Sequence, residues 1–375
     1  MNKFIVIEKK KHIMLISSWY PNRLDAYNGD FVQRHAIAIS QLNQVSVVHV
    51  EGDPNIKEWQ LETNQINDNL LEHIYYFPKS NMSFINFIRK IQGLIRGRKQ
   101  LGSIDLIHGN VVHYHFIWLL LQSLPYIITE HSTQFHRLHT LPHVWLKKLV
   151  FQPIYRNAKH VLPVSMHLGN KLEELFGKLP IRVVPNVIDT RMFYPMTTTN
   201  SIFTFLHVSN LSEAKNISGI LNAIILLKEM GLKFLFQIGG NGNIEIVENF
   251  RIKHQLEEVI EVLPTLSHAQ VAKYMQNANC FVLFSNFENQ PCVLAEALAS
   301  GLPFISSNVG GVKEFMPDQG AWVIHQDDSQ QLANQMATIM SEYSNIDKKV
   351  LVNYARQTFS NETISLKINK IYNDC

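Results

Sequence analysis

The feature that most constrains the fold of this chain is a repeated alternation of short apolar runs with helical patterns. In the first half, apolar runs lie at 12–18, 45–50, 106–108, 126–128 and 161–164. The first of them is followed by a loop and then by apolar residues at helical spacing over 31–42. The second half repeats the pattern, with apolar runs at 203–208, 234–238, 259–263, 280–284 and 303–306 and helical spacing over 217–230, 268–276 and 294–299. This order is typical of parallel sheets covered by helices. The sequence therefore predicts an α/β chain with two doubly wound, Rossmann-like sheets.

The length of 375 residues favours two domains, because one hydrophobic core seldom grows this large. A polar stretch with one proline, Phe193 to Asn200, is the predicted boundary. We therefore expect a first domain over 1–193 and a second domain over 201–355, followed by a helical pattern that continues to the end of the chain.

Cysteine content and hydropathy indicate a chain that works in a reducing compartment. The three cysteines are too few for a disulfide framework. The apolar run near the start, 4–7, is too short for a secretory signal, and no run is long enough to span a membrane. We expect a cytoplasmic protein, with possible peripheral contact at the inner face of the plasma membrane.

The stretch from Ser285 to Pro303 carries the clearest functional signal. It places Glu288 in a loop after an apolar run and Glu296 eight positions later, inside an Ala- and Leu-rich helical pattern that opens near Pro291. Helix N-termini present free N–H groups and partial positive charge, which suits a phosphate. A carboxylate beside it can accept both hydroxyls of a ribose. The pattern predicts a nucleoside-diphosphate site with a second acid available for chemistry.

This pattern resembles a family signature. The two glutamates, the segment Glu-Ala-Leu-Ala-Ser-Gly-Leu-Pro and the later segment 310–314, Gly-Gly-Val-Lys-Glu, are similar to the motif of family 4 glycosyltransferases of GT-B fold. Further stretches resemble the family in order along the chain, at 105–108, 125–131, 161–165 and 183–189. The resemblance implies two Rossmann-like domains facing a central cleft, with a final helix over 356–375 that packs back on the first domain.

The resemblance also implies an activity. It is retaining transfer of a sugar from a UDP- or GDP-sugar donor to a glycan or lipid-linked glycan acceptor in cell-surface polysaccharide biosynthesis. Family members generally need no metal, so neither a cofactor nor an essential metal is expected. Two alternatives stay open: a GT-B sugar-nucleotide epimerase, and a catalytically weak scaffold that only binds nucleotide.

Site residues follow from the same resemblance. Charge builds up on the leaving diphosphate in the transition state, so fixed positive groups stabilise it most. By resemblance Lys215 meets the diphosphate, while Glu288 and His131 reach the transferred sugar and Glu296 binds the ribose. The remaining donor-binding candidates are Asn289, Gln290, Pro291, Cys292, Gly29, Asp30, Ser209, Asn210, Gly239, Gly240, Leu263 and Pro264.

One position departs from the family pattern. Family members usually carry an arginine four or five residues before the lysine, and this chain has Asn210 there. Either Arg34 compensates for the missing charge or the donor site is weak or altered. Leu263 and Pro264 stand where the family holds the base mainly through backbone groups, so the sequence does not identify the base.

Several histidines cluster in the first half, at His113, His115, His136, His139 and His143. No cysteine or carboxylate joins them at the spacing of metal ligands, so we predict that they are ordinary polar positions rather than a metal site.

Charge is distributed unevenly. Residues 1–185 hold 21 Lys/Arg and 13 Asp/Glu, a net +8, whereas residues 186–375 hold 13 and 18, a net −5. Within the basic half, residues 84–99 combine an apolar helical stripe with five basic residues. This composition indicates either a helix lying on an anionic membrane or a surface helix packed on its own sheet. The basic balance favours the membrane, and no aromatic-plus-basic motif indicates nucleic acid.

Overall fold

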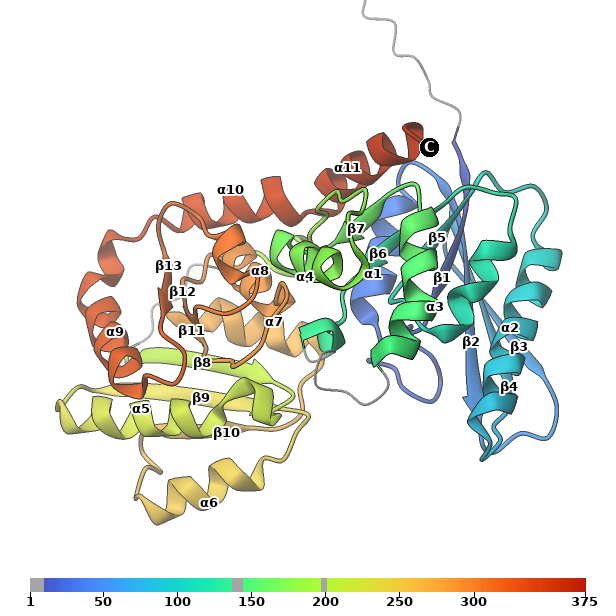
Figure 1. Ribbon diagram of the computed structural model, residues 1–375. Coiled ribbons are helices and arrows are strands. Elements are labelled where there is room, and N and C mark those ends of the chain that lie inside the picture. Colours follow the sequence, from blue (N-terminus) through green and yellow to red (C-terminus); the bar gives the residue numbers. More distant parts are fainter. Residues whose placement is uncertain (1–9, 137–143, 197–200) are drawn as a thin grey trace, which may run out of the picture. The chain divides into compact units, whose positions relative to one another are not determined.

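The computed structural model describes residues 10–136, 144–196 and 201–375. These form two compact units, one comprising the chain up to Val187 together with Asn361–Cys375, the other comprising Ile188–Ser360 (Figure 1). Each unit is built around its own sheet and its own hydrophobic core.

The first unit contains a seven-stranded sheet in the order β3-β4-β2-β1-β5-β6-β7. All neighbouring strands are parallel except the pair β3 and β4, which is antiparallel. The strands are β1 (His12–Ser17), β2 (Gln44–Asp53), β3 (Gln60–Asn67), β4 (Leu70–Pro78), β5 (Leu106–Asn110), β6 (Tyr126–Glu130) and β7 (Val161–Pro163).

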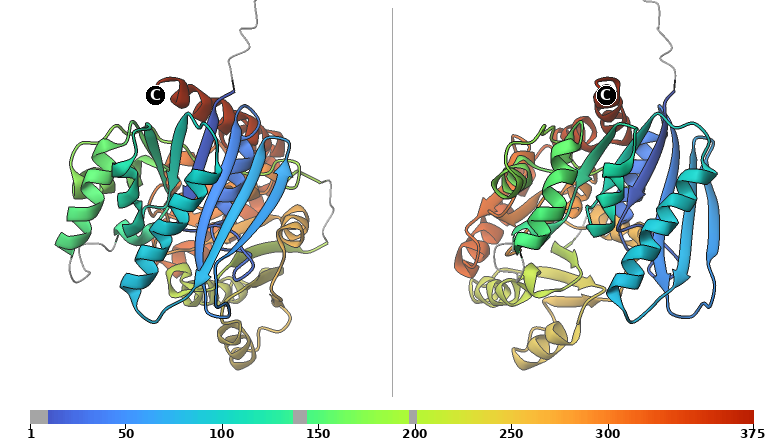
Figure 2. Two further views of the ribbon diagram at one scale, coloured as in Figure 1. Left: turned by 90° about the vertical axis from the view of Figure 1, so that its right-hand side faces the viewer. Right: turned by 45° about the vertical axis from the view of Figure 1, so that its right-hand side comes forward.

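Helices cover both faces of this sheet, as Figure 2 shows from two sides. One face is covered by α1 (Asp30–Ile39) and by the last helix, α11 (Asn361–Asn373). The other is covered by α2 (Ser83–Gln100), η1 (Tyr114–Leu121), α3 (Val144–Asn157) and α4 (Met166–Phe176), with the short η2 (Thr133–His136) beside them. Buried apolar side chains alternate between the two faces along β1, so each layer of helices has a separate core.

Two glycines bring α2 close to the sheet. A Cβ at Gly93 would lie 2.5 Å from a methyl group of Val50, and one at Gly97 would lie 2.5 Å from a methyl group of Val48. Only Gly93, Leu94 and Gly97 of this helix are buried, so contact with β2 runs along a narrow strip. Apart from Leu94, the larger apolar side chains of α2 are therefore left partly or fully outside the core.

The second unit contains a six-stranded, wholly parallel sheet in the order β10-β9-β8-β11-β12-β13. Its strands are β8 (Phe203–Ser209), β9 (Phe234–Gly240), β10 (Ile260–Leu263), β11 (Cys280–Leu283), β12 (Phe304–Ser307) and β13 (Ala321–Ile324). One face carries α5 (Ile217–Glu229), α6 (Glu245–Lys253) and α9 (Ser329–Glu342). The other carries α7 (His268–Asn277), α8 (Cys292–Ala299) and α10 (Lys348–Phe359). Short 3-10 turns, η4 (Glu213–Lys215), η5 (Val312–Phe315) and η6 (Tyr343–Asn345), join these elements.

The predicted fold class is confirmed, while the boundaries between the units differ from those predicted. The first unit ends at Val187 rather than at 193, because Ile188 and Phe193 already pack in the core beneath α7 and α8. The final helical pattern is divided into α10 and α11 at Ser360. The end of α10, which was expected to belong with the last helix, packs through Phe359 in the second unit, so only residues from Asn361 onward join the first.

Candidate functional site

The second unit holds the two predicted charges of the donor site in direct contact. The Lys215 ammonium donates a hydrogen bond of 2.6 Å to the Glu288 carboxylate. The Lys215 side chain is 20% exposed and that of Glu288 only 9%. A charge-assisted bond of this length between largely buried groups fixes both side chains.

Backbone hydrogen bonds explain why these two residues meet. Lys215 ends η4, between β8 and α5, whereas Glu288 lies in the loop between β11 and α8. The Asn286 N–H donates to the Ala214 carbonyl at 2.8 Å, and its side-chain amide donates to the Glu213 carbonyl at 3.3 Å. The two loops are thereby joined at the carboxyl ends of neighbouring strands, where open α/β sheets bind ligands.

A third loop closes on Glu288 from the other side. Gly310 has a φ of +57°, and a Cβ there would lie 1.7 Å from the Glu288 carbonyl oxygen. The next N–H, of Gly311, donates to the Asn289 carbonyl at 2.9 Å. Only glycine can occupy position 310 in this arrangement, because any side chain would collide with the backbone that carries Glu288.

Helix α8 follows this loop directly. Pro291 is its N-cap and makes no capping side-chain hydrogen bond, while the Leu294 N–H donates to the Pro291 carbonyl at 3.2 Å. The start of the helix also places partial positive charge beside this loop. Glu296 lies one turn in and is 4% exposed, while Asn289 and Gln290 are 5% exposed. The predicted residues from Glu288 to Glu296 thus form one continuous, largely buried stretch.

Close backbone contacts also occur where β8 and β9 end. A Cβ at Gly240 would lie 1.5 Å from the Ser209 carbonyl oxygen, and one at Gly239 would lie 2.6 Å from the Leu263 Cβ. Asn210 accepts a hydrogen bond from the Ser212 N–H at 3.3 Å, within a local turn. The structure thus brings Ser209, Asn210, Gly239, Gly240 and Leu263, which Pro264 follows, to neighbouring loops, and Asn210 serves the turn that precedes Lys215.

In the first unit, Gly29 occupies the turn before α1. Its φ is +68°, and a Cβ there would lie 2.4 Å from the backbone carbonyl of Trp19, so glycine is required. Asp30 opens the helix and forms an ion pair with Arg34. Arg34, considered above as a replacement for the missing arginine, is therefore engaged with Asp30.

His131 lies just after β6 and is 8% exposed. Its Nδ1 is 2.9 Å from the Asn186 side-chain oxygen, and its ring packs against those of Phe31 and His35, with centroids 4.6 and 5.1 Å away. Burial, followed by the effect of nearby His35, lowers the pKa of His131 well below its usual value. The imidazole is therefore neutral at physiological pH, with Asn186 fixing its orientation.

Glu130 is a buried residue of this region that the sequence interpretation missed. Its carboxylate accepts hydrogen bonds from the Tyr155 hydroxyl (2.7 Å) and from the N–H groups of Val112 (3.1 Å), His131 (3.0 Å) and Ser132 (2.9 Å). Burial raises its pKa, and these hydrogen bonds oppose the rise. A glutamate at the end of an otherwise apolar strand was the available signal, because a buried carboxylate needs such partners.

The loop that Glu130 holds is strained. Val111 has a φ of +56°, a conformation that costs a β-branched residue on the order of 1–3 kcal/mol. Glu130 therefore ties a distorted turn after β5 to the segment that carries His131.

The expected lack of a metal stays a prediction. Among the described residues, no group of three or more His, Cys, Asp or Glu side chains could hold a metal ion. His139, His143 and the side chain of His136 lie outside the described part of the chain. Over the same described ranges, no helix is both long and apolar enough to cross a membrane.

Comparisons with known proteins agree with this architecture. A family model described as "Glycosyltransferase Family 4" matches residues 31–191, and one described as "Glycosyl transferases group 1" matches residues 199–358. Together they cover most of the chain, one over the first sheet and one over the second.

Curated relatives share only about a quarter of their aligned residues with this chain. Over 201 residues the chain is 26% identical to a phosphatidylinositol N-acetylglucosaminyltransferase subunit of Arabidopsis thaliana, covering 52% of this chain and 45% of that protein. Over 231 residues it is 25% identical to the putative colanic acid biosynthesis glycosyltransferase WcaL of Escherichia coli, covering 59% and 57%. The match thus spans about half the length of these relatives.

Solved structures show the same fold. Sucrose-phosphate synthase from Thermosynechococcus elongatus has a TM-score of 0.75 at 18% identity, covering 97% of this chain and 99% of that one. Anabaena HepE in complex with UDP-glucose has a TM-score of 0.70 at 15% identity, covering 97% and 100%. The architecture is that of a GT-B glycosyltransferase. With both family models matched in order, the chain belongs to glycosyltransferase family 4.

Proposed function

We propose that this protein is a retaining glycosyltransferase that moves a sugar from a nucleoside-diphosphate sugar to a glycan or lipid-linked glycan acceptor. The observation that carries the proposal is the Lys215–Glu288 contact, in a loop that packs against Gly310 and leads directly into the N-terminus of α8. A cation, a carboxylate and the positive end of a helix are the chemistry that a sugar diphosphate requires.

In this proposal each residue has a defined task. Lys215 and the first N–H groups of α8 neutralise charge on the departing diphosphate, and Glu296 accepts the ribose hydroxyls. Glu288 holds Lys215 in place and contacts the donor sugar. In the first unit, neutral His131 can donate or accept a hydrogen bond with a sugar hydroxyl without introducing a charge.

The relatives support the donor and the acceptor class. Solved complexes of HepE contain UDP, and one contains UDP-glucose, which favours a uridine nucleotide over GDP. WcaL is named for colanic acid biosynthesis, and the Arabidopsis relative for a phosphatidylinositol acceptor. Both names favour an acceptor that belongs to a membrane or a cell-surface glycan.

Thermal unfolding with UDP-, GDP- and ADP-sugars tests the donor. We expect UDP-sugars to raise the melting temperature of the wild type and of a Glu258→Ala control, whose side chain is exposed, but not of Glu296→Ala. A Glu296→Ala variant that keeps the full nucleotide shift would remove Glu296 from the ribose site.

Product analysis separates the alternatives. A transferase releases nucleotide and forms a glycoside only when an acceptor is present, and retention gives the anomeric configuration of the donor. Nucleotide release with an epimerised sugar and no acceptor would establish the epimerase. Nucleotide binding without either product, across a broad acceptor panel, would establish the scaffold.

Helix α2 supports peripheral contact with an anionic membrane, as part of the same proposal. Phe84 is 67% exposed, while Ile88 and Ile95 are each 38% exposed, and the helix carries five basic residues and no acidic one. A helix that buried its apolar stripe on its own sheet would not leave these side chains exposed. The close approach through Gly93 and Gly97 is the reason that it does.

Liposome flotation tests this contact. We expect the protein to float with vesicles containing anionic lipid and not with neutral ones, and an Ile88→Ser/Ile95→Ser variant to float less. Leu61→Ser, on β3 and 41% exposed, is the matched control. Equal behaviour on both kinds of vesicle, or no flotation, would refute the membrane contact.

A further inference from the structure

A hollow of about 630 Å³ opens between the first turns of α2 and the start of η1. It lies where the chain leaves β4 and β5, at the carboxyl ends of these parallel-sheet strands. The residues that line it include Phe84, Phe87, Lys90, His113, Tyr114 and His115. A volume of this size is within the range of small-molecule sites in proteins.

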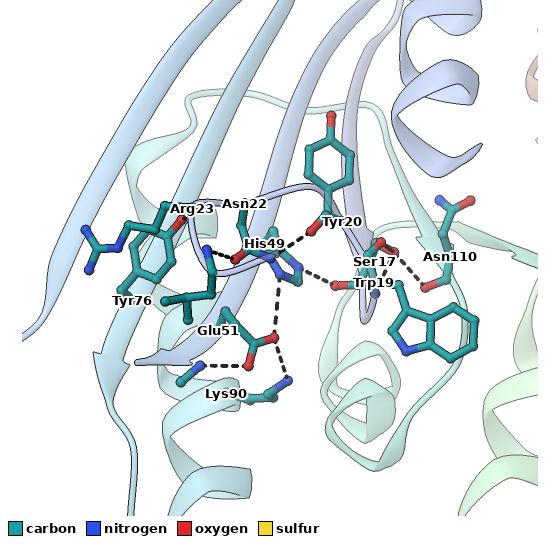
Figure 3. A network of polar contacts seen from close by, with 12 residues as sticks. Ser17, Trp19, Tyr20, Asn22, Arg23, His49, Glu51, Tyr76, Lys90 and Asn110 are labelled. Atoms are coloured by element: carbon teal, nitrogen blue, oxygen red, sulfur yellow. Dashed lines mark hydrogen bonds and ion pairs between the residues drawn. The ribbon is translucent and has the colours of Figure 1, made fainter. Parts of the chain in front are cut away.

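The polar side of the hollow contains a cation with a loose partner. The Lys90 ammonium lies 3.6 Å from a carboxylate oxygen of Glu51, and the same oxygen lies 3.7 Å from His49 Nε2 (Figure 3). Neither distance is that of a close hydrogen bond. Burial lowers the pKa of His49 to about 4, so this imidazole is neutral and Lys90 is the positive group facing Glu51.

A buried histidine at the hollow has an unused polar atom. His115 is 3% exposed, and its Nδ1 has no hydrogen-bond partner among the described residues. Buried polar atoms are nearly always paired, so an unpaired one in a residue that lines a hollow makes that residue a candidate partner for a bound group. His113 adds a second, exposed imidazole at the rim.

The helix that forms one wall supplies further donors. Helix α2 begins after Met82, whose side chain provides no capping hydrogen bond, and its first turn carries no acidic residue. The N–H groups of Ile85 and Asn86 donate to the Met82 carbonyl, which leaves those of Ser83 and Phe84 as the donors nearest the hollow. An 18-residue helix also places partial positive charge there.

The remaining wall is apolar. Phe84 and Phe87 lie with ring centroids 6.4 Å apart in a stacked arrangement, and Tyr114 packs on Phe151 of the core. Phe84 is largely exposed, although burying a phenylalanine is worth about 1.5–3 kcal/mol. A ligand that fits must therefore carry an anionic end and a hydrocarbon part next to it.

We propose that the hollow between α2 and η1 binds a lipid phosphate, with the phosphate on Lys90, His115 and the start of α2, and the first part of the hydrocarbon chain against Phe84, Phe87 and Tyr114. This inference rests on the proposed function, since it identifies the acceptor as a lipid-linked one. The 3.6 Å between Lys90 and Glu51 leaves the ammonium without a close acceptor in this pair, and a phosphate would provide one.

Direct binding to the full chain, without donor, tests the inference. The probes are farnesyl monophosphate, farnesol and inorganic phosphate, titrated by calorimetry below the micelle-forming concentration. We expect farnesyl monophosphate to bind roughly tenfold or more tightly than either of the others, because a hydrogen bond to a charged group and burial of the chain contribute together. Equal binding of farnesol would show an apolar site without phosphate recognition, and equal binding of phosphate would show an anion site only; either result overturns the proposal.

Two matched variants locate the ligand. Lys90→Met should weaken farnesyl monophosphate binding roughly tenfold, whereas Lys99→Met, the same change at an exposed position near the end of α2, should leave it within about twofold. Phe84→Ser should weaken farnesyl monophosphate but not inorganic phosphate. Equal losses in the two lysine variants would show that only the general positive charge of the helix matters and would overturn the site.

The glycosyltransferase proposal and the lipid-phosphate proposal can be refuted independently of each other. The Lys90→Met variant keeps all donor-site residues, so its UDP-sugar shift should equal that of the wild type. If no nucleotide sugar binds the wild type but farnesyl monophosphate binding depends on Lys90, the glycosyltransferase proposal fails and the lipid-phosphate site stands. If nucleotide sugars bind and farnesyl monophosphate does not, the reverse holds.

Discussion

At the scale of single residues, the donor site depends on backbone contacts as much as on charged side chains. The loop carrying Glu288 is held from one side by hydrogen bonds from Asn286 to the η4 turn and from the other by the close approach of Gly310. The charged pair with Lys215 follows from this arrangement. Substitutions that leave both charges in place can therefore still remove the site.

Gly310→Ala tests this dependence. The new Cβ would lie 1.7 Å from the Glu288 carbonyl oxygen, so the loop must move, and we expect loss of the UDP-sugar shift. Gly231→Ala is the matched control: φ is +75° there, but nothing lies within 4 Å, so it should cost only about 1–2 kcal/mol of strain and keep nucleotide binding. Urea unfolding measures the stability of the two variants, and the nucleotide-induced rise in melting temperature measures their binding. Normal binding by Gly310→Ala would contradict the proposed loop packing.

Glu130→Gln tests the other unit. The variant replaces one acceptor oxygen by an NH₂ group, which would face two of the four donors now bound by the carboxylate. We expect a loss of about 1–3 kcal/mol in unfolding free energy and a lower kcat with the donor KM unchanged. The Tyr155 hydroxyl can turn and accept from that NH₂ group, whereas a backbone N–H cannot, so adding Tyr155→Phe should lower the stability further rather than recover it. A fall in stability without any change in kcat would show that Glu130 does not position His131.

At the scale of helices and strands, the periodicity of apolar residues predicted many of the elements that pack in the two cores. Most strands of both sheets were visible as apolar runs, because strands buried on both faces are nearly continuous in apolar residues. Strand β13, at the edge of the second sheet, was not predicted. Strand β3 was not predictable in this way: it is an antiparallel edge strand, and its side chains are almost all exposed. Strand β4 was missed although its buried tyrosines and Phe77 gave a signal.

The residues of the candidate sites likewise divide into those that the sequence predicted and those that it did not. Glu288 and Glu296 were singled out by their fixed spacing and Lys215 by the resemblance of its own segment. The structure joins Lys215 to Glu288, while the roles of all three stay predictions. The hollow at His115 was not predictable, since its walls come from elements far apart in the sequence. Glu130 gave a signal at the end of its apolar strand, but its partners Val112 and Tyr155, which lie outside that strand, could not be inferred. The apolar stripe of α2 was recognised from the sequence. Its exposure depends on the close contact of Gly93 and Gly97 with the sheet, which the periodicity of apolar residues does not reveal.

The last helix offers a test at this scale. Ile368 on α11 is fully buried against α1 and the sheet, whereas Leu366 on the same helix is 64% exposed. Ile368→Ala should lower the unfolding free energy by about 2–5 kcal/mol, and Leu366→Ala should change it by about 0.5 kcal/mol or less. Urea denaturation measures the difference. Equal effects would show that α11 does not contribute to the core of the first unit.

At the scale of the whole molecule, the two units differ in their buried histidines. Burial lowers the pKa of imidazoles in the first unit to about 4 at His35 and His49, to about 3 at His108, and well below the usual value at His115 and His131. In the second unit the corresponding buried residue is His207, with a pKa of about 4. Neutral imidazoles are therefore concentrated in one of the two cores.

This difference predicts unequal sensitivity to acid. Below the unfolded pKa of about 6.5 the unfolded chain binds protons that the folded chain does not, so stability falls with pH until the folded pKa near 4 is reached. Each buried imidazole removes roughly 1 kcal/mol per pH unit in that window, and the first unit has more of them. Hydrogen exchange between pH 7 and 4, corrected for intrinsic rates, should show β1 and β5 losing protection at higher pH than β8 and β9. Simultaneous loss in both sheets would contradict the prediction.

The membership of α11 in the first unit has a consequence for biosynthesis. The ribosome completes the second unit, Ile188–Ser360, as one uninterrupted segment, whereas the first unit awaits Asn361–Cys375 before one face of its sheet is covered. Nascent chains of this protein thus present uncovered apolar side chains of α1 and the sheet until Asn361–Cys375 has been synthesised. That interval is when chaperone binding and aggregation would compete most with folding.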